Sequence, residues 1–323
     1  MNKKSSVKEE KRKRLVLLDA HAILHRSYHG MPDLTDKNGN PTGALYGYIS
    51  MISRIKNDLM PDYIASCYDL PKPTFRHLAY DNYKGTRSAT DDELKMQIDI
   101  SYDICKGLNI PIYTAEGFEA DDLLGTIAKQ MGERHPDIEV IIASGDMDTM
   151  QLINDTVKVY TLKKGSETAM YDYDAVVARY GFTPKQIPDY KSIAGDTSDN
   201  IIGVPGIGVK GATELIQKYG SLENLYNTIE KEDFDFKAAG MRERMYNLLV
   251  ENKDGAEFSR VLATIRTDAP VTYEPIDWIV NKTDYVAICD RFGFRSLREK
   301  FDDYVADAPL VATLQASPQE AHP

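Results

Sequence analysis

The 323-residue sequence predicts an α/β domain with a mostly parallel sheet, followed by a smaller section built of helices. Three observations lead to this prediction. Up to about residue 161, short apolar runs rich in β-branched residues alternate with longer runs of helical periodicity. After about residue 172 the strand-like runs stop, while helical runs continue with short polar breaks. Residues 305–323 carry no clear periodicity and are typical of a tail or a linker.

The elements are assigned from these patterns in chain order. Behind a basic leader at residues 1–14, strands are expected at 15–18, 63–68, 110–113, 139–143 and 157–162, with a short strand at 169–171 after a turn at 163–166. In the first domain, residues 15–171, helices are expected at 43–60, 91–108, 120–134 and within 149–153. In the second section, residues 172–304, they are expected at 184–194, 209–219, 222–229 and 238–252.

The composition is that of an ordinary globular protein and argues against several classes. The chain is 42% hydrophobic and 28% charged, and it contains no apolar run of about 18 residues that would span a membrane. The three cysteines are far apart and form no CxxC pair, so neither a disulfide framework nor a zinc ribbon is expected, and a reducing cytosol fits best. The net charge of −11 argues against a phosphate-binding surface, unless many acids gather in one pocket and are neutralised by divalent cations.

Aspartates follow three of the predicted strands at the point where each strand ends. Asp19 and Asp69 follow the first two strands, and Asp146 and Asp148 follow the fourth. Because the carboxyl ends of parallel strands line one edge of a sheet, where ligands bind, these side chains should converge. One such Asp is usually a turn residue or a helix cap. Three strand ends together place like charges side by side, which costs energy unless cations offset them.

A second group of acids opens the predicted helix at 120–134. Glu119, Asp121 and Asp122 precede an apolar series with helical spacing, so they lie on its first turn. A favourable interaction with the helix dipole explains one or two acids there, at about 0.3–1 kcal/mol each. Three acids in four residues exceed that need, although capping alone remains an alternative.

A third group is the pair Asp196 and Asp199, followed at once by the glycine-rich stretch at 203–210. Alone, the pair is typical of a helix start or an Asx-turn. The glycine-rich stretch leads into a helix, where backbone N–H groups and Lys210 are available to a phosphate. A plain helix–turn–helix connection would explain it equally well, but its position beside an acid pair makes it informative.

The ligand type in these three groups indicates the metal. Carboxylate oxygens without His or Cys favour Mg²⁺ or Mn²⁺ over zinc. Two such ions about 3.5–4 Å apart can activate a water and stabilise the leaving oxygen in phosphodiester hydrolysis. That chemistry needs more carboxylates than one ion does.

A basic and aromatic segment lies between the second strand and the acidic helix. It combines Arg76, Lys84 and Arg87 with aromatic residues that include Tyr80 and Tyr83. This mixture is expected where single-stranded nucleic acid passes, with rings for bases and cations for phosphates. Lys84 and Arg87 also suit the charge of a scissile phosphate. The alternative is a surface loop with two tyrosines in the core.

Taken together, seven motifs closely resemble the 5′–3′ exonuclease domain of bacterial DNA polymerase I and its relatives, the bacteriophage 5′ nucleases and flap endonucleases. They are LLDAH, CYD, YKGTR, GFEADD, SGDMD, GDTSDN and GVPGIGVKGA, in the family's order over roughly residues 14–300. The resemblance implies a PIN-like nuclease core with a helical arch at about residues 74–108. It also implies a C-terminal helical DNA-binding module, with a helix–hairpin–helix-type unit at about 184–219.

The resemblance also implies roles for individual residues. The acids around a first metal ion would be Asp19, Asp69, Glu119, Asp121 and Asp122. Those around a second would be Asp146, Asp148, Asp196 and Asp199. Lys84 and Arg87 would be gateway cations and Tyr83 would stack on a base. The duplex backbone would meet a hairpin that often holds K⁺, formed by Gly206, Ile207, Gly208 and Lys210.

The function expected on this basis is a structure-specific 5′–3′ exonuclease and 5′-flap endonuclease in DNA replication and repair. Its substrates would be DNA with 5′ flaps, nicks or RNA primers, in the bacterial cytosol or nucleoid. We expect a monomer, with a DNA polymerase acting in cis or in trans, because the chain resembles either a stand-alone nuclease or a piece of a polymerase. A catalytically silent DNA-junction-binding protein and a PIN-type ribonuclease are the alternatives. The first motif reads Asp19-Ala20-His21, where the family usually has Asp-Gly.

Overall fold

The structure is a computed structural model that describes residues 12–162, 168–302 and 304–305. Most of the expected leader, the expected turn at 163–166 and the expected tail from residue 306 lie outside the described residues. Arg14, assigned to the leader, is the first residue of a strand.

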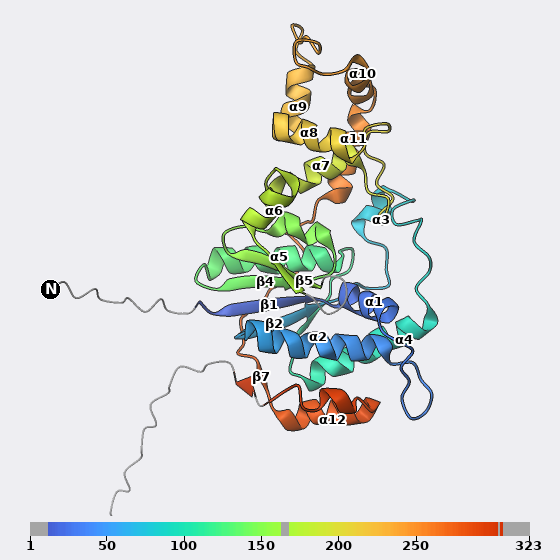
Figure 1. The fold of residues 1–323 in the computed structure, drawn as a ribbon, viewed down its shortest axis with the longest axis vertical. Helices are drawn as coiled ribbons and strands as arrows, with labels where there is room; N and C mark the ends of the chain where they lie inside the picture. Colours follow the sequence, from blue (N-terminus) through green and yellow to red (C-terminus); the bar gives the residue numbers. More distant parts are fainter. Residues whose placement is uncertain (1–11, 163–167, 303, 306–323) are drawn as a thin grey trace, which may run out of the picture.

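A six-stranded sheet forms the centre of the larger domain (Figure 1). Its strands are β1 (Arg14–Asp19), β2 (Tyr63–Cys67), β3 (Ile112–Tyr113), β4 (Glu139–Ala143), β5 (Val157–Leu162) and β6 (Thr168–Tyr171). The order is β3-β2-β1-β4-β5-β6, and every pair is parallel except β5 with β6. The predicted mostly parallel sheet is therefore confirmed.

Both faces of the central strands are buried, which explains the uninterrupted apolar runs of β1 and β4. Within β1, Leu15 and Leu17 belong to one core cluster, whereas Val16 and Leu18 belong to another. The first cluster contains the apolar face of α5 (Ala120–Arg134). The second is covered by α1 (Ala20–Gly30), α2 (Gly43–Leu59) and α4 (Asp92–Gly107).

The helix α1 was not among the predicted elements. It begins directly after β1, because the Asp19 carboxylate accepts a hydrogen bond from the Ala22 backbone N–H at 3.0 Å and so caps its first turn. Its buried face is short and includes Ile23 and Leu24, so the sequence carries little helical periodicity there.

The chain between β2 and β3 crosses the edge of the sheet where the strands end. A short helix, α3 (Phe75–Ala79), is followed by residues 80–91 without regular helix or strand, and then by α4, which packs on α2. We call residues 80–91 the crossing segment. It occupies the middle of the expected arch.

The helical section stands beyond the sheet, at the top of Figure 1. Its helices are α6 (Tyr173–Tyr180), α7 (Ile187–Ala194), α8 (Val209–Tyr219), α9 (Leu222–Ile229), α10 (Glu243–Glu251) and α11 (Lys253–Ala263). Short 3₁₀ turns occur at Met147–Leu152, Pro184–Gln186 and Arg295–Leu297. Helix α11 packs on α7, and carbonyls near its end accept hydrogen bonds from Arg76 and Gln151 of the larger domain. Among the described residues, no helix combines the length and apolar character needed to cross a membrane.

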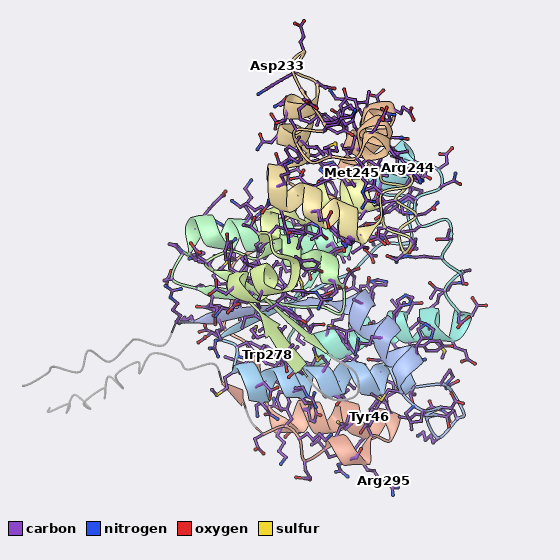
Figure 2. The ribbon with its side chains drawn as sticks, turned by 45° about the horizontal axis from the view of Figure 1, so that its top comes forward. Tyr46, Asp233, Arg244, Met245, Trp278 and Arg295 are labelled. Atoms are coloured by element: carbon purple, nitrogen blue, oxygen red, sulfur yellow. The ribbon has the colours of Figure 1, made fainter. Side chains whose placement is uncertain are left out.

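The final part of the chain returns to the sheet domain, contrary to the expectation of one helical section to residue 304. A two-stranded sheet of β7 (Ile279–Val280) and β8 (Tyr304–Val305) accompanies α12 (Lys282–Phe292). Trp278 is buried and donates from its indole nitrogen to the carbonyl of Leu108 at 2.8 Å. Figure 2 shows Trp278 and Tyr46 in the layer where α12 lies under α2. A buried tryptophan needs both a core and an acceptor, and the sheet domain provides them.

Candidate active site

The ends of three neighbouring strands bring the first group of acids together. The strand order reverses at β1, which lies between β2 and β4, so their carboxyl ends border one crevice. Asp19 ends β1, Asp69 follows β2 by two residues, and Asp146 follows β4 by three. The predicted convergence of strand-end acids therefore holds for these three residues.

This acidic crevice has two compartments. The first compartment, of about 250 Å³, is lined by the five acids Asp19, Asp69, Glu119, Asp121 and Asp146. The second compartment, of about 410 Å³, is lined by the three acids Asp146, Asp148 and Asp196. Asp146 and Arg87 line both compartments. Asp146 is therefore the one acid that lines both compartments.

Burial and mutual repulsion shape the charge of the first compartment. Burial raises the pKa of Asp19 to about 7, against hydrogen bonds from Ser144 and Ala22 that favour the carboxylate. Burial, together with the charges of Asp19 and Asp146, also raises the pKa of Asp121 well above its usual value. Carboxylates in this situation gain from a nearby cation, because a positive charge offsets both effects.

Two backbone contacts hold Asp69 at the edge of the first compartment. Its carboxylate accepts a hydrogen bond from the Ala120 backbone N–H at 2.6 Å, at the start of α5. Its own backbone N–H donates to Nδ1 of His21 at 3.1 Å. Burial lowers the pKa of His21, and that of His25 one turn later.

Lys191 on α7 is a residue of the second compartment that sequence analysis missed. Its ammonium pairs with both Asp148 and Asp196. Burial raises the pKa of Asp148 to about 6, and Lys191 opposes that rise. Burial also acts on Asp196, but Lys191 and hydrogen bonds from Ser198 hold its pKa below the usual value. The only sequence signal was a lysine five residues before Asp196, which is too common to be informative.

Glu119 lines the first compartment, but its carboxylate already accepts several hydrogen bonds. Lys84 donates to one oxygen at 2.9 Å, and Arg76 and the Tyr83 hydroxyl donate to the other at 3.2 Å each. Burial favours the neutral amine of Lys84, yet Glu119 and Asp199 keep its pKa above the usual value. Lys84 also has a φ of +54°, a strained backbone conformation that is common at functional sites.

Asp122 does not reach the crevice, although the sequence grouped it with the first metal ion. Its two oxygens accept four hydrogen bonds, from both terminal nitrogens of Arg76 and from the backbone N–H groups of Glu119 and Arg266, at 2.8–3.0 Å. A carboxylate offers about four acceptor positions, so none is left for a metal ion. Asp122 is fully buried and belongs to a structural ion pair.

The DNA-binding role expected for Arg76 is wrong. Its side chain is only 3% exposed, which leaves no surface for a phosphate. Besides Asp122, it donates to the carbonyls of Leu262 at 2.9 Å and Thr264 at 2.8 Å. Arg76 therefore joins α3, α5 and the end of α11.

Tyr83 and Asp199 connect the crossing segment to the helical section. The Tyr83 ring is buried against His77, so it does not offer the free face that base stacking requires. Its hydroxyl has one proton, which is shared between Asp199 at 3.1 Å and Glu119 at 3.2 Å, and the other Asp199 oxygen pairs with Arg87. Asp199 lines neither compartment. The side chain of Arg87 remains half-exposed beside both compartments.

The glycine-rich stretch forms the predicted connection between α7 and α8. Gly206 has a φ of +92° and is exposed, as are Gly208 at the N-cap of α8 and Lys210 in its first turn. The side chain of Ile207 is buried and anchors the loop. Exposed backbone and a lysine at a helix start are suited to a phosphate.

The carboxylate oxygens of the crevice are suitable ligands for hard divalent cations. Three of its carboxylates have raised pKa values, and all of its acids are oxygen donors. Among the described residues, no three His, Cys, Asp or Glu side chains converge at metal-binding distance. In this arrangement Lys191 bridges Asp148 and Asp196 where a second cation would act.

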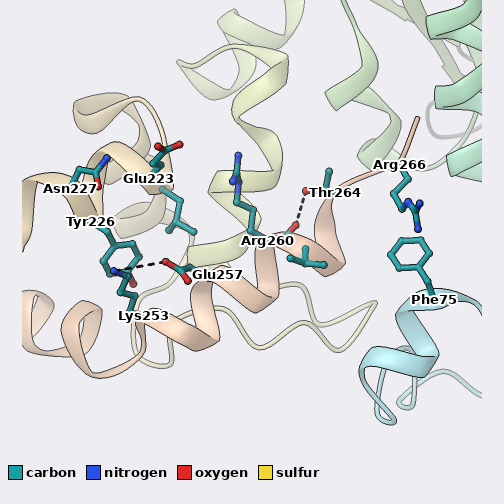
Figure 3. Close-up of a pocket in the computed structure, with 11 residues that line it drawn as sticks. Phe75, Glu223, Tyr226, Asn227, Lys253, Glu257, Arg260, Thr264 and Arg266 are labelled. Carbon is teal, nitrogen blue, oxygen red and sulfur yellow. Dashed lines mark hydrogen bonds and ion pairs between the residues drawn. The ribbon is translucent and has the colours of Figure 1, made fainter. Parts of the chain in front are cut away.

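A larger cavity, of about 600 Å³, lies apart from the acids, between α9, α11 and Phe75 (Figure 3). Its two carboxylates, Glu223 and Glu257, are accompanied by Lys253 and two arginines. The charges there are mixed, and no acid group converges. The chemistry therefore identifies the acidic crevice as the candidate active site.

Comparisons with known proteins show the family to which the chain belongs. Residues 14–181 match the family model of the 5′-3′ exonuclease, N-terminal resolvase-like domain, and residues 182–286 match that of the 5′-3′ exonuclease, C-terminal SAM fold. DNA polymerase I of Chloroflexus aurantiacus is 38% identical over 313 residues, which cover 94% of this chain and 32% of that protein. DNA polymerase I of Bacillus caldotenax is 36% identical over 295 residues, covering 90% and 32%.

Solved structures share the fold. The T5 5′-exonuclease with bound zinc ions has a TM-score of 0.64 at 21% identity, covering 79% of this chain and 90% of that one. The catalytic core of Rad2 in complex with a DNA substrate has a TM-score of 0.54 at 16% identity, covering 87% and 88%. The chain spans about a third of the length of the polymerase relatives that it matches. With its resolvase-like, PIN-type core and its SAM-like helical section, the chain belongs to the 5′–3′ exonuclease family.

Proposed function

We propose that the protein is a structure-specific 5′–3′ exonuclease and 5′-flap endonuclease that hydrolyses DNA, and the RNA of primers, with two Mg²⁺ ions. The position of Asp146 carries the proposal, because it joins two compartments that are each lined by further carboxylates. A two-ion site needs either one carboxylate that serves both ions or two groups of ligands that lie close together. The exonuclease family models and the metal-bound T5 5′-exonuclease support the same conclusion.

In this proposal the acids divide between the compartments. Asp19, Asp69 and Asp121 hold one ion, Asp148 and Asp196 hold the other, and Asp146 lies between them. When bound, the ions would activate the attacking water and neutralise charge on the reacting phosphate, and Mn²⁺ would serve in place of Mg²⁺. Asp122 and Asp199 line neither compartment, so their expected ligand roles become positioning roles. Glu119 also has a positioning role, because Lys84 and Arg76 donate to its two oxygens.

The cations of the crossing segment act on the substrate. Lys84 and Arg87 line the first compartment, where they stabilise the negative charge of the scissile phosphate. The water oxygen forms a bond to phosphorus as the bond to the 3′ oxygen breaks. The products are a 3′-hydroxyl and a 5′-phosphate.

The duplex part of the substrate lies on the helical section in this proposal. The exposed loop at Gly206 and Gly208, with Lys210, contacts the duplex backbone, and loop carbonyls hold a K⁺ ion. The DNA-bound Rad2 core supports a DNA substrate. The protein works as a monomer in the bacterial cytosol or nucleoid, with a DNA polymerase in cis or in trans.

The test uses a labelled 5′-flap substrate. The protein should cut it with Mg²⁺ and spare it in EDTA, and Asp146→Asn should bind the flap normally but cut it at least a hundredfold more slowly, because both compartments lose a ligand. Asp137→Asn is the matched control, since Asp137 is exposed in the turn that leads into β4. Undiminished cleavage by Asp146→Asn would refute the shared role of Asp146. Tight flap binding without Mg²⁺-dependent cleavage would indicate a silent junction-binding protein, and preference for unstructured RNA would indicate a ribonuclease.

A further inference from the structure

His21 lies in the crevice near an acid, Asp69, and a cation, Lys84. It is the second residue of α1, directly behind Asp19, and it lines the first compartment together with Asp69 and Lys84. Its side chain is 19% exposed. The ring packs edge-on against buried Tyr68, with centroids 5.7 Å apart, so its orientation is restrained.

One ring nitrogen of His21 is already used. Nδ1 accepts the hydrogen bond from the backbone N–H of Asp69 at 3.1 Å. An imidazole nitrogen that accepts a hydrogen bond carries no proton, so this contact places the ring proton on Nε2. The contact therefore holds the loop that carries Asp69 and also selects the tautomer.

The other nitrogen is a donor without a protein acceptor among the described residues. The cations of the compartment are already paired with acids, since Lys84 donates to Glu119 and Arg87 donates to Asp199 and to the Ser198 carbonyl. The other titratable groups of the lining are carboxylates, which only accept, and His25, whose ring centroid lies 6.5 Å from that of His21. Nε2–H is thus a neutral donor in a pocket that the substrate backbone must enter.

We propose that His21 has two functions in one ring: Nδ1 positions Asp69, and Nε2–H donates a hydrogen bond to a non-bridging phosphate oxygen of the substrate strand. This inference rests on the proposed function, because it requires a phosphodiester in the first compartment. A neutral donor suits this place, since it binds a phosphate oxygen without competing with metal cations for the carboxylates.

Two conservative variants separate the two functions. In His21→Asn, the amide oxygen can replace Nδ1 as acceptor for Asp69, but the side chain is too short to replace Nε2–H. In His21→Gln, the longer amide can replace the Nε2–H donor but leaves the Asp69 N–H without its acceptor. His21→Ala removes both contacts. His29→Asn is the matched control, since His29 lies on the same helix and is exposed.

The readouts are flap binding without metal, single-turnover cleavage at saturating flap, and the Mg²⁺ concentration for half-maximal rate. His21→Asn should bind the flap roughly ten- to hundredfold more weakly, as expected for a lost hydrogen bond to a charged group, with a normal saturated rate and Mg²⁺ requirement. His21→Gln should bind normally but cut more slowly and need more Mg²⁺. His21→Ala should combine both defects, and His29→Asn should match the wild type.

A chemically altered substrate identifies the contacted atom. If a phosphate oxygen accepts from Nε2–H, a neutral methylphosphonate at one linkage of the flap should remove the binding difference between wild type and His21→Asn. Unchanged flap binding by His21→Asn would overturn the donor function, and an unchanged Mg²⁺ requirement in His21→Gln would overturn the positioning function. Because binding is measured without metal, a failure of the proposed cleavage activity would be seen separately.

Discussion

Replacing Asp19 by asparagine should make the metal-free protein more stable while it removes activity. Burial raises the pKa of Asp19 from the ordinary 3.8 to about 7, so the native state disfavours the ionised carboxylate. At about 1.4 kcal/mol for each pKa unit, ionised Asp19 destabilises the metal-free fold by roughly 4 kcal/mol. Asparagine avoids this cost and keeps an acceptor for the Ala22 N–H. Because the pKa of about 7 already includes the hydrogen bonds from Ser144 and Ala22, the expected net gain is up to roughly 4 kcal/mol above pH 7.

The sign of the pH dependence follows from the direction of the shift. A raised native pKa means that the native state binds the proton more tightly than the unfolded state, so wild-type stability from this group is complete below pH 3.8 and is lost as pH rises through about 7. The advantage of Asp19→Asn should therefore be larger at pH 8 than at pH 5. Urea unfolding in EDTA at both pH values measures it, with Asp137→Asn as control. A less stable variant, or an equal gain at both pH values, would refute the reasoning.

Two further predictions concern structural contacts. Arg76→Met should lower the free energy of unfolding by about 3–5 kcal/mol, because it leaves Asp122 buried without its partner. Chemical denaturation should show that stability recovers in the double variant that also carries Asp122→Leu. A double variant as unstable as Arg76→Met would contradict this account. Gly203→Ala should cost at least about 1 kcal/mol, because Gly203 has a φ of +67° and its added Cβ would lie 2.3 Å from the backbone nitrogen of Gly195. Thermal melting should show little change for Gly208→Ala, whose Cβ meets no atom within 4 Å, and equal effects of the two glycine variants would argue against the backbone clash.

Local patterns were sufficient for most of the sheet and for the helices with strong periodicity. The strands β1 and β4 are buried on both faces, so their apolar runs are continuous and bounded by polar residues. Helix α1 and the return of the chain at Trp278 were missed. A short helix whose stability comes from a cap and tertiary packing has little periodic signal, and the partner of Trp278 lies 170 residues away.

The sequence by itself determined which acids stand at strand ends, and hence that Asp19, Asp69 and Asp146 meet at one edge of a parallel sheet. This holds because strand direction and chain order are sufficient to place the end of a strand. Only the tertiary structure decided which of two neighbouring acids on one helix turn lines the crevice. Asp121 and Asp122 are adjacent, and successive helical residues point about 100° apart, so one lines the crevice while the other meets Arg76. The partners of Lys191, Tyr83 and His21 come from distant segments, and no local pattern specifies such contacts.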